Sequence, residues 1–137
     1  RRRSREPLAR YERGLPQVAY AVGDTRVLAR LSLRHLRAGR DAPPELTEAL
    51  DSLASAVWEL AGAYDDDRRP HAVRDAALGA ATRLEAAVET ARDVRLAELV
   101  AQVRSVAVDL VRAADLAGGP YEADAERPTE ELLASAR

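Results

Sequence analysis

The sequence contains no cysteine, methionine or phenylalanine, and it also lacks isoleucine, asparagine and lysine. The absence of cysteine excludes disulfides, thiolate metal ligands and a cysteine nucleophile. No run approaches the roughly 18 consecutive apolar residues of a membrane-spanning helix, and no apolar core of a secretion signal is present. We therefore expect neither a membrane span nor a signal peptide within this chain.

The residues that remain favour helix. Hydrophobic residues make up 47% of the 137 positions, and the abundant alanine, leucine, glutamate and arginine lose little free energy on entering a helix. A chain of this length forms one domain with one core. Because no strand-like alternation competes with the helical periodicity, we predict an all-α protein whose core is an antiparallel four-helix bundle.

Glycines and prolines divide the chain into three predicted parts. Residues 1–16 form a basic lead segment with a short helix, which Pro16 ends or kinks. Residues 17–119 form the four-helix bundle, in which Gly39 stops the first helix and Pro44 begins the second. Residues 120–137 form a polar tail with a short helix.

Each bundle helix carries an apolar stripe at helical spacing, which predicts the side chains of the core. In the first helix the stripe contains Val18, Ala21, Thr25, Leu28, Ser32 and His35. In the second it contains Leu46, Leu50, Leu53, Val57, Leu60 and Tyr64. The third has the smallest residues, Val73, Ala77, Ala80, Leu84, Val88 and Ala91. The fourth has Leu96, Leu99, Val103, Val106, Leu110, Ala113 and Ala117.

Charge is distributed unevenly along the chain. Residues 1–40 hold 11 arginines and 3 acids, a net charge of +8, whereas residues 41–137 hold 10 arginines and 20 acids, a net charge of −10. Such asymmetry indicates that the N-terminal region faces an anionic partner. Nucleic acid is not expected, because the body is acidic and only four tyrosines and one tryptophan are present for stacking.

Four of these arginines, Arg26, Arg30, Arg34 and Arg37, share one helix face because of their spacing. This face pairs either with acids of the second bundle helix or with anionic lipid, which attracts each arginine by about 1 kcal/mol. In the lipid alternative, we expect the four to form one positive end together with Arg1, Arg2 and Arg3.

No motif marks an active site, so we expect no catalytic residues, no metal, no cofactor and no enzymatic activity. The histidines, His35 and His71, lie at none of the spacings that place two ligands on one helix face. A nucleophile elbow and a glycine-rich phosphate loop are both missing. We expect His35 to be a hydrogen-bonded core residue and His71 a surface residue at a helix start.

One polar group interrupts the fourth helix. Asp109 lies four residues after Ser105 and three before Arg112, which is the spacing of contacts within one helix. We predict a structural cluster that fixes helix register, so that Asp109→Asn lowers stability modestly. Its members are Gln102, Arg104, Ser105, Asp109 and Arg112.

Residues 99–114, LVAQVRSVAVDLVRAA, resemble a segment of fusaric-acid-resistance-like membrane proteins, the aromatic acid exporter type found in actinobacteria. The family pattern is V-x-Q-V/L-R-S-x-x-x-D-L-L/V-R-A-x-G, and the cluster residues fall on it. Residues 21–39, AVGDTRVLARLSLRHLRAG, resemble a second family segment, with Gly23 and Asp24 where the pattern has arginine and asparagine.

The resemblance implies a regulatory or assembly domain on the cytoplasmic face of the cell membrane, attached to a membrane-embedded exporter of small organic or aromatic acids. Its partners would be the membrane-embedded part of the same polypeptide, an anionic lipid surface and a second copy in a homo-oligomer. The basic start of the chain would then lie next to a membrane span.

Two alternatives remain open. The chain forms a free-standing helical module that binds other proteins, or it forms a ligand-binding bundle with a pocket beside its small-residue helix.

Overall fold

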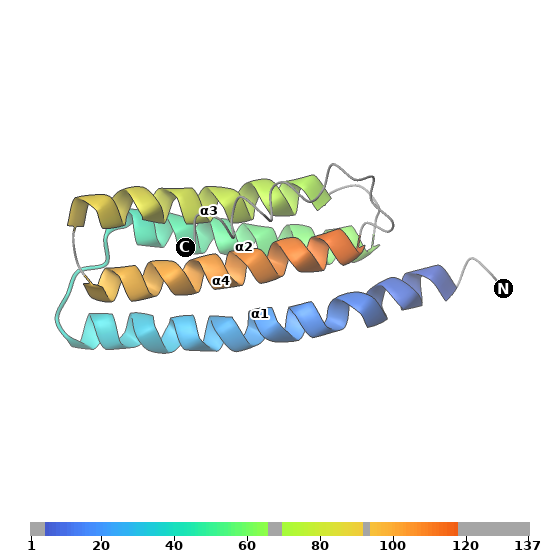
Figure 1. The fold of residues 1–137 in the computed structure, drawn as a ribbon, viewed down its shortest axis with the longest axis horizontal. Coiled ribbons are helices and arrows are strands. Elements are labelled where there is room, and N and C mark those ends of the chain that lie inside the picture. The colour runs from blue at the N-terminus through green and yellow to red at the C-terminus, as the bar shows by residue number, and fades with distance from the viewer. Residues whose placement is uncertain (1–4, 66–69, 92–93, 118–137) are drawn as a thin grey trace.

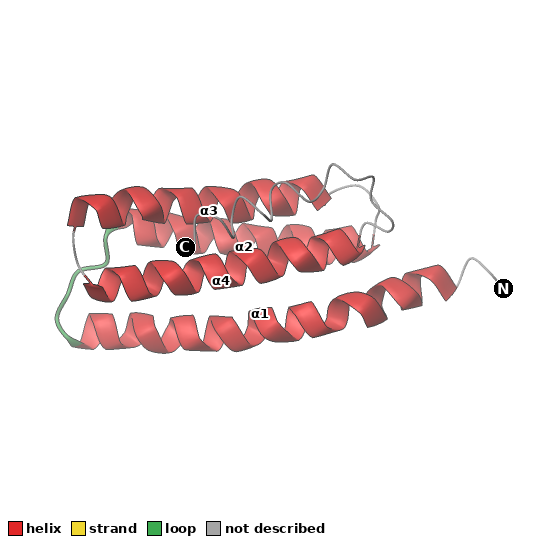
Figure 2. Cartoon of the chain, in the orientation of Figure 1, coloured by secondary structure: helices red, strands yellow, loops and turns green. Residues whose placement is uncertain are grey.

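The structure is a computed structural model that describes residues 5–65, 70–91 and 94–117. Within these ranges the chain forms four helices and no strand: α1 (Arg5–Arg37), α2 (Pro44–Asp65), α3 (Pro70–Ala91) and α4 (Val94–Ala117). Successive helices run in opposite directions and lie side by side as a bundle (Figure 1, Figure 2). The predicted all-α bundle is therefore confirmed. The short helix predicted within residues 120–137 lies outside the described ranges.

The connection between α1 and α2 follows the glycine and proline signals of the sequence. Gly39 adopts a positive φ of 69°, a conformation that residues with a Cβ rarely adopt. Its N–H donates to the Leu36 carbonyl at 3.0 Å, as expected for a helix C-terminus. Pro44 then takes the first position of α2, where a missing N–H costs nothing. Both predicted boundaries are confirmed.

Of the two predicted effects of Pro16, an end or a kink, the end is wrong, because α1 continues through this proline from Arg5 to Arg37. The N-terminal part of the helix is held against α2: the rings of Tyr11 and Tyr64 stack with centroids 5.0 Å apart. Gly14 meets the same tyrosine, and a Cβ there would overlap its hydroxyl. These contacts offset the hydrogen bond that an interior proline removes. The described part of the predicted lead segment and the first bundle helix thus belong to one continuous helix.

The core is centred on α4. All seven residues of its predicted stripe are buried, and so are Val100, Ala107, Val111 and Ala114. Burial on several sides arises because α4 packs along α1 on one side and along α3 and α2 on the others. Figure 1 shows α4 lying between α1 and the pair formed by α2 and α3. Every other helix thus depends on α4 for part of its buried surface.

The predicted stripe of α2 is half right. Leu46, Leu53 and Leu60 are buried, but the helix also buries Ala49, Ala56 and Ala63. Leu50 is only half-buried, and Val57 is 51% exposed. The difference arises because α1 meets α2 only near its own N-terminal end and leaves the Leu50 and Val57 side at the edge of the core.

The stripe of small residues predicted for α3 packs into the core as expected. Val73, Ala77, Ala80 and Leu84 are 0% exposed, whereas the side chains of Val88 and Ala91 lie outside the described part. Among the helices in the described ranges, none combines the length and the apolar content that a bilayer crossing requires.

The register of α2 can be tested by comparing two substitutions. Leu53→Ala should lower the free energy of unfolding by about 2–5 kcal/mol, because it opens a cavity in the core. Val57→Ala should change it by no more than about 0.5 kcal/mol, as expected for a surface position. Equilibrium denaturation measures both values. Equal losses at the two positions would contradict this register.

Candidate functional site

Four arginines lie on the outer face of α1: Arg26, Arg30, Arg34 and Arg37. We call this surface the arginine face. All four side chains are exposed, and within the part of the chain that the structure describes none of them forms an ion pair. Pairing with the acids of α2 is not observed, because α1 packs along α4 and barely meets α2. Glu48 of α2 instead faces Arg83 of α3, with Oε2 and Nε 3.9 Å apart.

Apolar side chains accompany the arginine face. Leu33 is 46% and Leu36 is 56% exposed on the same helix. A shallow groove of about 460 Å³ runs among Arg30, Arg34 and Arg37, with Val27, Leu31 and Leu33 as its other walls. Guanidinium groups beside exposed leucines are typical of helices that lie at a lipid interface.

The arginine face lies in the C-terminal half of α1, far from Arg5 at the start of this helix. With a rise of 1.5 Å per residue, α1 places Arg5 and Arg37 at opposite ends of a helix about 50 Å long. Arg1, Arg2 and Arg3, which we expected to form one positive end with this face, lie outside the described residues. The positive charge of α1 lies along its side.

A polar cluster joins α1 to α4 through Asp24. The Ser105 hydroxyl donates a hydrogen bond to Asp24 Oδ2, and Gln102 Nε2 donates to the Asp24 backbone carbonyl at 3.1 Å. Asp109 belongs to the same group and is only 8% exposed. Four polar residues thus lie together within an otherwise apolar contact between two helices.

The two carboxyl groups of this cluster influence each other. Burial raises the pKa of Asp109 above its ordinary value of 3.8, and the nearby Asp24 raises this pKa further by charge repulsion and by a side-chain hydrogen bond. The positive charge of Arg112 acts in the opposite direction and lowers the pKa. The protonated form of Asp109 is therefore favoured in the folded protein relative to the unfolded chain.

The five α4 residues of the predicted cluster do not all lie together. Gln102, Ser105 and Asp109 lie against α1. Arg104 lies on another side of α4 and forms an ion pair with Glu85 of α3. Arg112 is exposed and acts on Asp109 only through its charge. The cluster therefore joins two helices, and it does not act within α4 alone, as the spacing had suggested.

Sequence reasoning missed Asp24 and Arg74. Asp24 had appeared only as a departure from the pattern of the resembled family, and its partners lie about 80 residues away along the chain. Arg74 is buried on α3 and forms an ion pair with Asp115 of α4. Neither position carries a local signal, because each partner is supplied by another helix.

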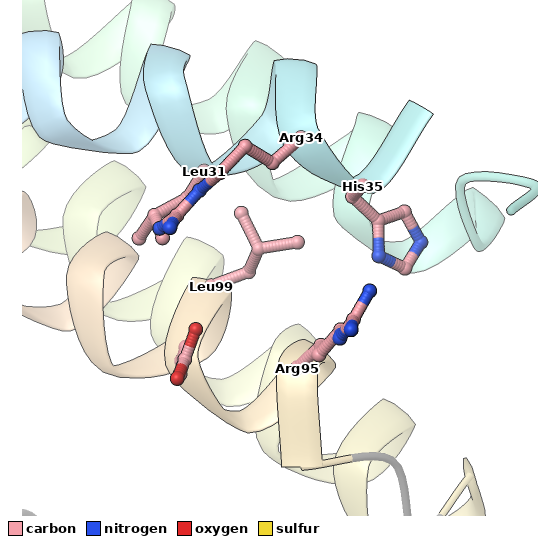
Figure 3. A pocket seen from close by; sticks show the side chains of 6 residues that line it. Leu31, Arg34, His35, Arg95 and Leu99 are labelled. Carbon is pink, nitrogen blue, oxygen red and sulfur yellow. The ribbon is translucent and has the colours of Figure 1, made fainter. Parts of the chain in front are cut away.

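A pocket of about 300 Å³ lies between the C-terminal part of α1 and the N-terminal part of α4. Leu31, Arg34 and His35 line it from α1, and Arg95, Glu98 and Leu99 line it from α4. Figure 3 shows Leu31 and Leu99 between the two helices and the Arg95 guanidinium directed toward the His35 ring. We call this cavity the α1–α4 pocket.

His35 is buried, as predicted, but only one of its two ring nitrogens has a hydrogen-bond partner. Nε2 lies 3.3 Å from the Asp41 carbonyl oxygen. This oxygen can only accept, so Nε2 carries the proton and Nδ1 is the remaining ring nitrogen. Nδ1 is buried and has no hydrogen-bond partner. His71 lies exposed in the first turn of α3, as the sequence predicted.

The acidic pair gives the stability of the protein a specific pH dependence. As the pH rises above 3.8, the unfolded chain releases the Asp109 proton first, so the free energy of unfolding falls until the raised folded pKa is passed. Asp109→Asn should remove this fall in the free energy of unfolding, so the variant should be more stable than wild type near neutral pH. The sequence alone had led us to expect a modest loss of stability from the same substitution.

Denaturation of wild type and Asp109→Asn across this pH range measures the difference between their unfolding free energies. Asp51→Asn, at an exposed position of α2, serves as the control and should follow wild type. A difference between Asp109→Asn and wild type that does not change with pH would contradict the account.

Comparison of the chain with known protein families, with curated proteins and with solved structures finds no match. A functional assignment therefore depends on the surfaces described above. Those described so far are the arginine face, the polar cluster between α1 and α4, and the α1–α4 pocket. The polar cluster is enclosed by two helices, which leaves the other two as surfaces that can meet a partner.

Proposed function

We propose that this chain is an accessory domain of a membrane protein and that its arginine face binds anionic lipid on the cytoplasmic leaflet. The observation that carries the proposal is the exposure of all four arginines of this face without an ion pair to any described residue. Four guanidinium groups at about 1 kcal/mol each are enough for reversible attachment to an anionic surface.

The orientation of the domain follows from the same feature. Because the arginine face runs along the side of α1, the long axis of the helix would lie parallel to the membrane surface. Leu33 and Leu36 would enter the headgroup region beside the arginines. The acidic residues of the other helices would point away from the negatively charged leaflet, which repels them.

The resemblance to fusaric-acid-resistance-like proteins supports a more specific form of the proposal. In that form the membrane-embedded part of the same polypeptide exports small organic or aromatic acids, and this domain regulates it or assists its assembly. The proposal assigns no catalysis to this chain.

An apolar surface favours protein contact as a second role. Leu8, Leu15 and Tyr20 of α1 and Trp58 of α2 are each at least 60% exposed. A groove of about 280 Å³ lined by Tyr11, Leu15, Val18, Val57, Leu60, Ala61 and Tyr64 lies next to them. Exposed apolar patches of this kind mark protein contacts. The membrane-embedded part, a second copy or, for a free-standing module, another protein would bind here.

Vesicle binding tests the lipid proposal directly. The variant with Arg26, Arg30, Arg34 and Arg37 all replaced by glutamine should bind anionic vesicles at least tenfold more weakly than wild type at low salt, because its face has lost the attracting charges. Wild-type binding should fall as added salt screens those charges. Cosedimentation with vesicles of neutral and anionic lipid measures both effects.

A matched control separates the arginine face from total charge. Replacing Thr47, Ala54, Ser55 and Thr82 with glutamate changes the net charge by the same amount at exposed positions of α2 and α3. This control should bind more strongly than the glutamine variant. Equal binding of wild type to neutral and anionic vesicles, or no binding to either, would rule out the lipid proposal.

A further inference from the structure

One side of the bundle, between α1 and α2, is open. α1 packs along α4 and meets α2 only near its own N-terminal end. There, Tyr11, Leu15 and Val18 of α1 line a groove of about 280 Å³ together with Val57 and Tyr64 of α2. A bundle closed on this side would bury such side chains in its core. We call the surface that these two helices present here the α1–α2 side.

α1 borders the α1–α2 side with a second stripe, beside the one that packs on α4. Leu15 and Val22 lie seven residues apart on one helix face and are 67% and 47% exposed. Arg26, Arg30 and Leu33 continue the same face at steps of four, four and three residues, and all three are exposed. The border that α1 provides is therefore apolar at first and basic in its C-terminal half.

α2 borders the α1–α2 side with an apolar and acidic edge. Asp51, Ala54, Trp58 and Ala61 are exposed at steps of three, four and three residues, so they share one face. Ala61 also lines the groove next to α1, which places this face on the α1–α2 side. Trp58 is 81% exposed, and Asp51 forms no ion pair with any described residue.

The two edges match in their position along the bundle. α1 and α2 run in opposite directions and are joined by the loop at residues 38–43 (Figure 1). Arg30 lies seven residues before the end of α1 and Asp51 seven after the start of α2, so both lie about 10 Å from the loop. By the same measure, Val22 and Trp58 both lie about 20 Å from the loop.

These matched positions make the α1–α2 side complementary to a second copy of itself. A two-fold axis parallel to the helices leaves each position along the bundle unchanged and places α1 of one copy on α2 of the other. Arg30 then lies opposite Asp51, and Val22 lies opposite Trp58. Because the symmetry repeats every contact, one dimer contains two of each.

Charge selects this orientation over the other symmetric one. A two-fold axis running across the helices would place α1 of one copy on α1 of the other. The guanidinium groups of Arg26 and Arg30 would then face those of the second copy, and like charges placed together repel. The parallel axis replaces this repulsion with attraction between arginine and aspartate.

We propose that two copies of this chain pair through the α1–α2 side, about a two-fold axis parallel to their helices. Arg30 of each copy pairs with Asp51 of the other, and Val22 packs against Trp58. The inference rests on the protein-contact role proposed above for the apolar surface of α1 and α2, and it commits that role to one partner. Because pairing engages Arg30, it competes with lipid for part of the arginine face.

Charge reversal tests the pairing, with analytical ultracentrifugation of the full chain over a range of concentrations as the measurement. Wild type should form a reversible dimer. Arg30→Asp and Asp51→Arg should each raise the dimer Kd by about tenfold or more, because like charges then meet twice. An equimolar mixture of the two variants should recover dimers, since each contact between them joins opposite charges. One chain that carries both substitutions should recover dimers for the same reason.

Two controls separate pairing from changes in the single chain. Arg34→Asp makes the same charge change on the side of α1 that borders α4, and it should leave the dimer Kd unchanged. Trp58 is the only tryptophan of the chain, so its emission should shift to shorter wavelength as the dimer covers it. Circular dichroism establishes that each variant is folded. Below the dimer Kd, Asp51 is exposed as in the single chain, and Asp51→Asn remains a control for unfolding.

The pairing and the lipid proposal can fail separately. Asp51→Arg leaves the arginine face intact, so this variant should lose the dimer and still bind anionic vesicles. The proposal is overturned if wild type stays monomeric at every concentration, if neither charge reversal alters the dimer Kd, or if the mixture of the two variants does not recover dimers.

Discussion

The packing of α1 along one main neighbour, α4, with only its N-terminal part touching α2, is the constraint on which the remaining features depend. α2, α3 and α4 share a core of leucine, valine and alanine, whereas α1 contributes mainly Ala21, Leu28 and His35 along its length. A helix that packs mainly on one neighbour leaves its other faces in solvent. The arginine face is exposed for this reason, and the α1–α4 pocket exists because the contact is not closed at its C-terminal end.

The same constraint explains which sequence expectations failed. Periodicity located α4 and its seven inward residues correctly, because a helix surrounded on several sides buries most of its apolar positions. Periodicity misplaced Val57, because a stripe shows that a helix has an apolar side but not which neighbour covers it. The expectation that a helix ends at Pro16 failed for a related reason. Contacts of α1 with Tyr64, which lies on α2, offset the backbone hydrogen bond that the proline removes.

The candidate sites were harder to predict than the fold. The spacing of Arg26, Arg30, Arg34 and Arg37 located the arginine face, since residues of one helix share a side whatever surrounds them. The pocket and the Asp24 cluster combine residues that are about 60 to 85 positions apart. A pattern within one helix cannot show which residues of another helix will contact it. The segment that resembles the family includes Ser105 and Asp109, but it does not show that both interact with Asp24. That interaction follows from the packing of α1 against α4.

The central claim, that α1 meets α4 at Asp24 and Asp109, is tested most directly by a double-mutant cycle. Unfolding free energies of Asp24→Asn, Asp109→Asn and the double variant are compared with wild type near neutral pH. Either single substitution relieves the repulsion, so the second should add little, and the sum should deviate from additivity by about 0.5 kcal/mol or more. Additive effects, as found for residues that do not touch, would contradict the packing of α1 described above.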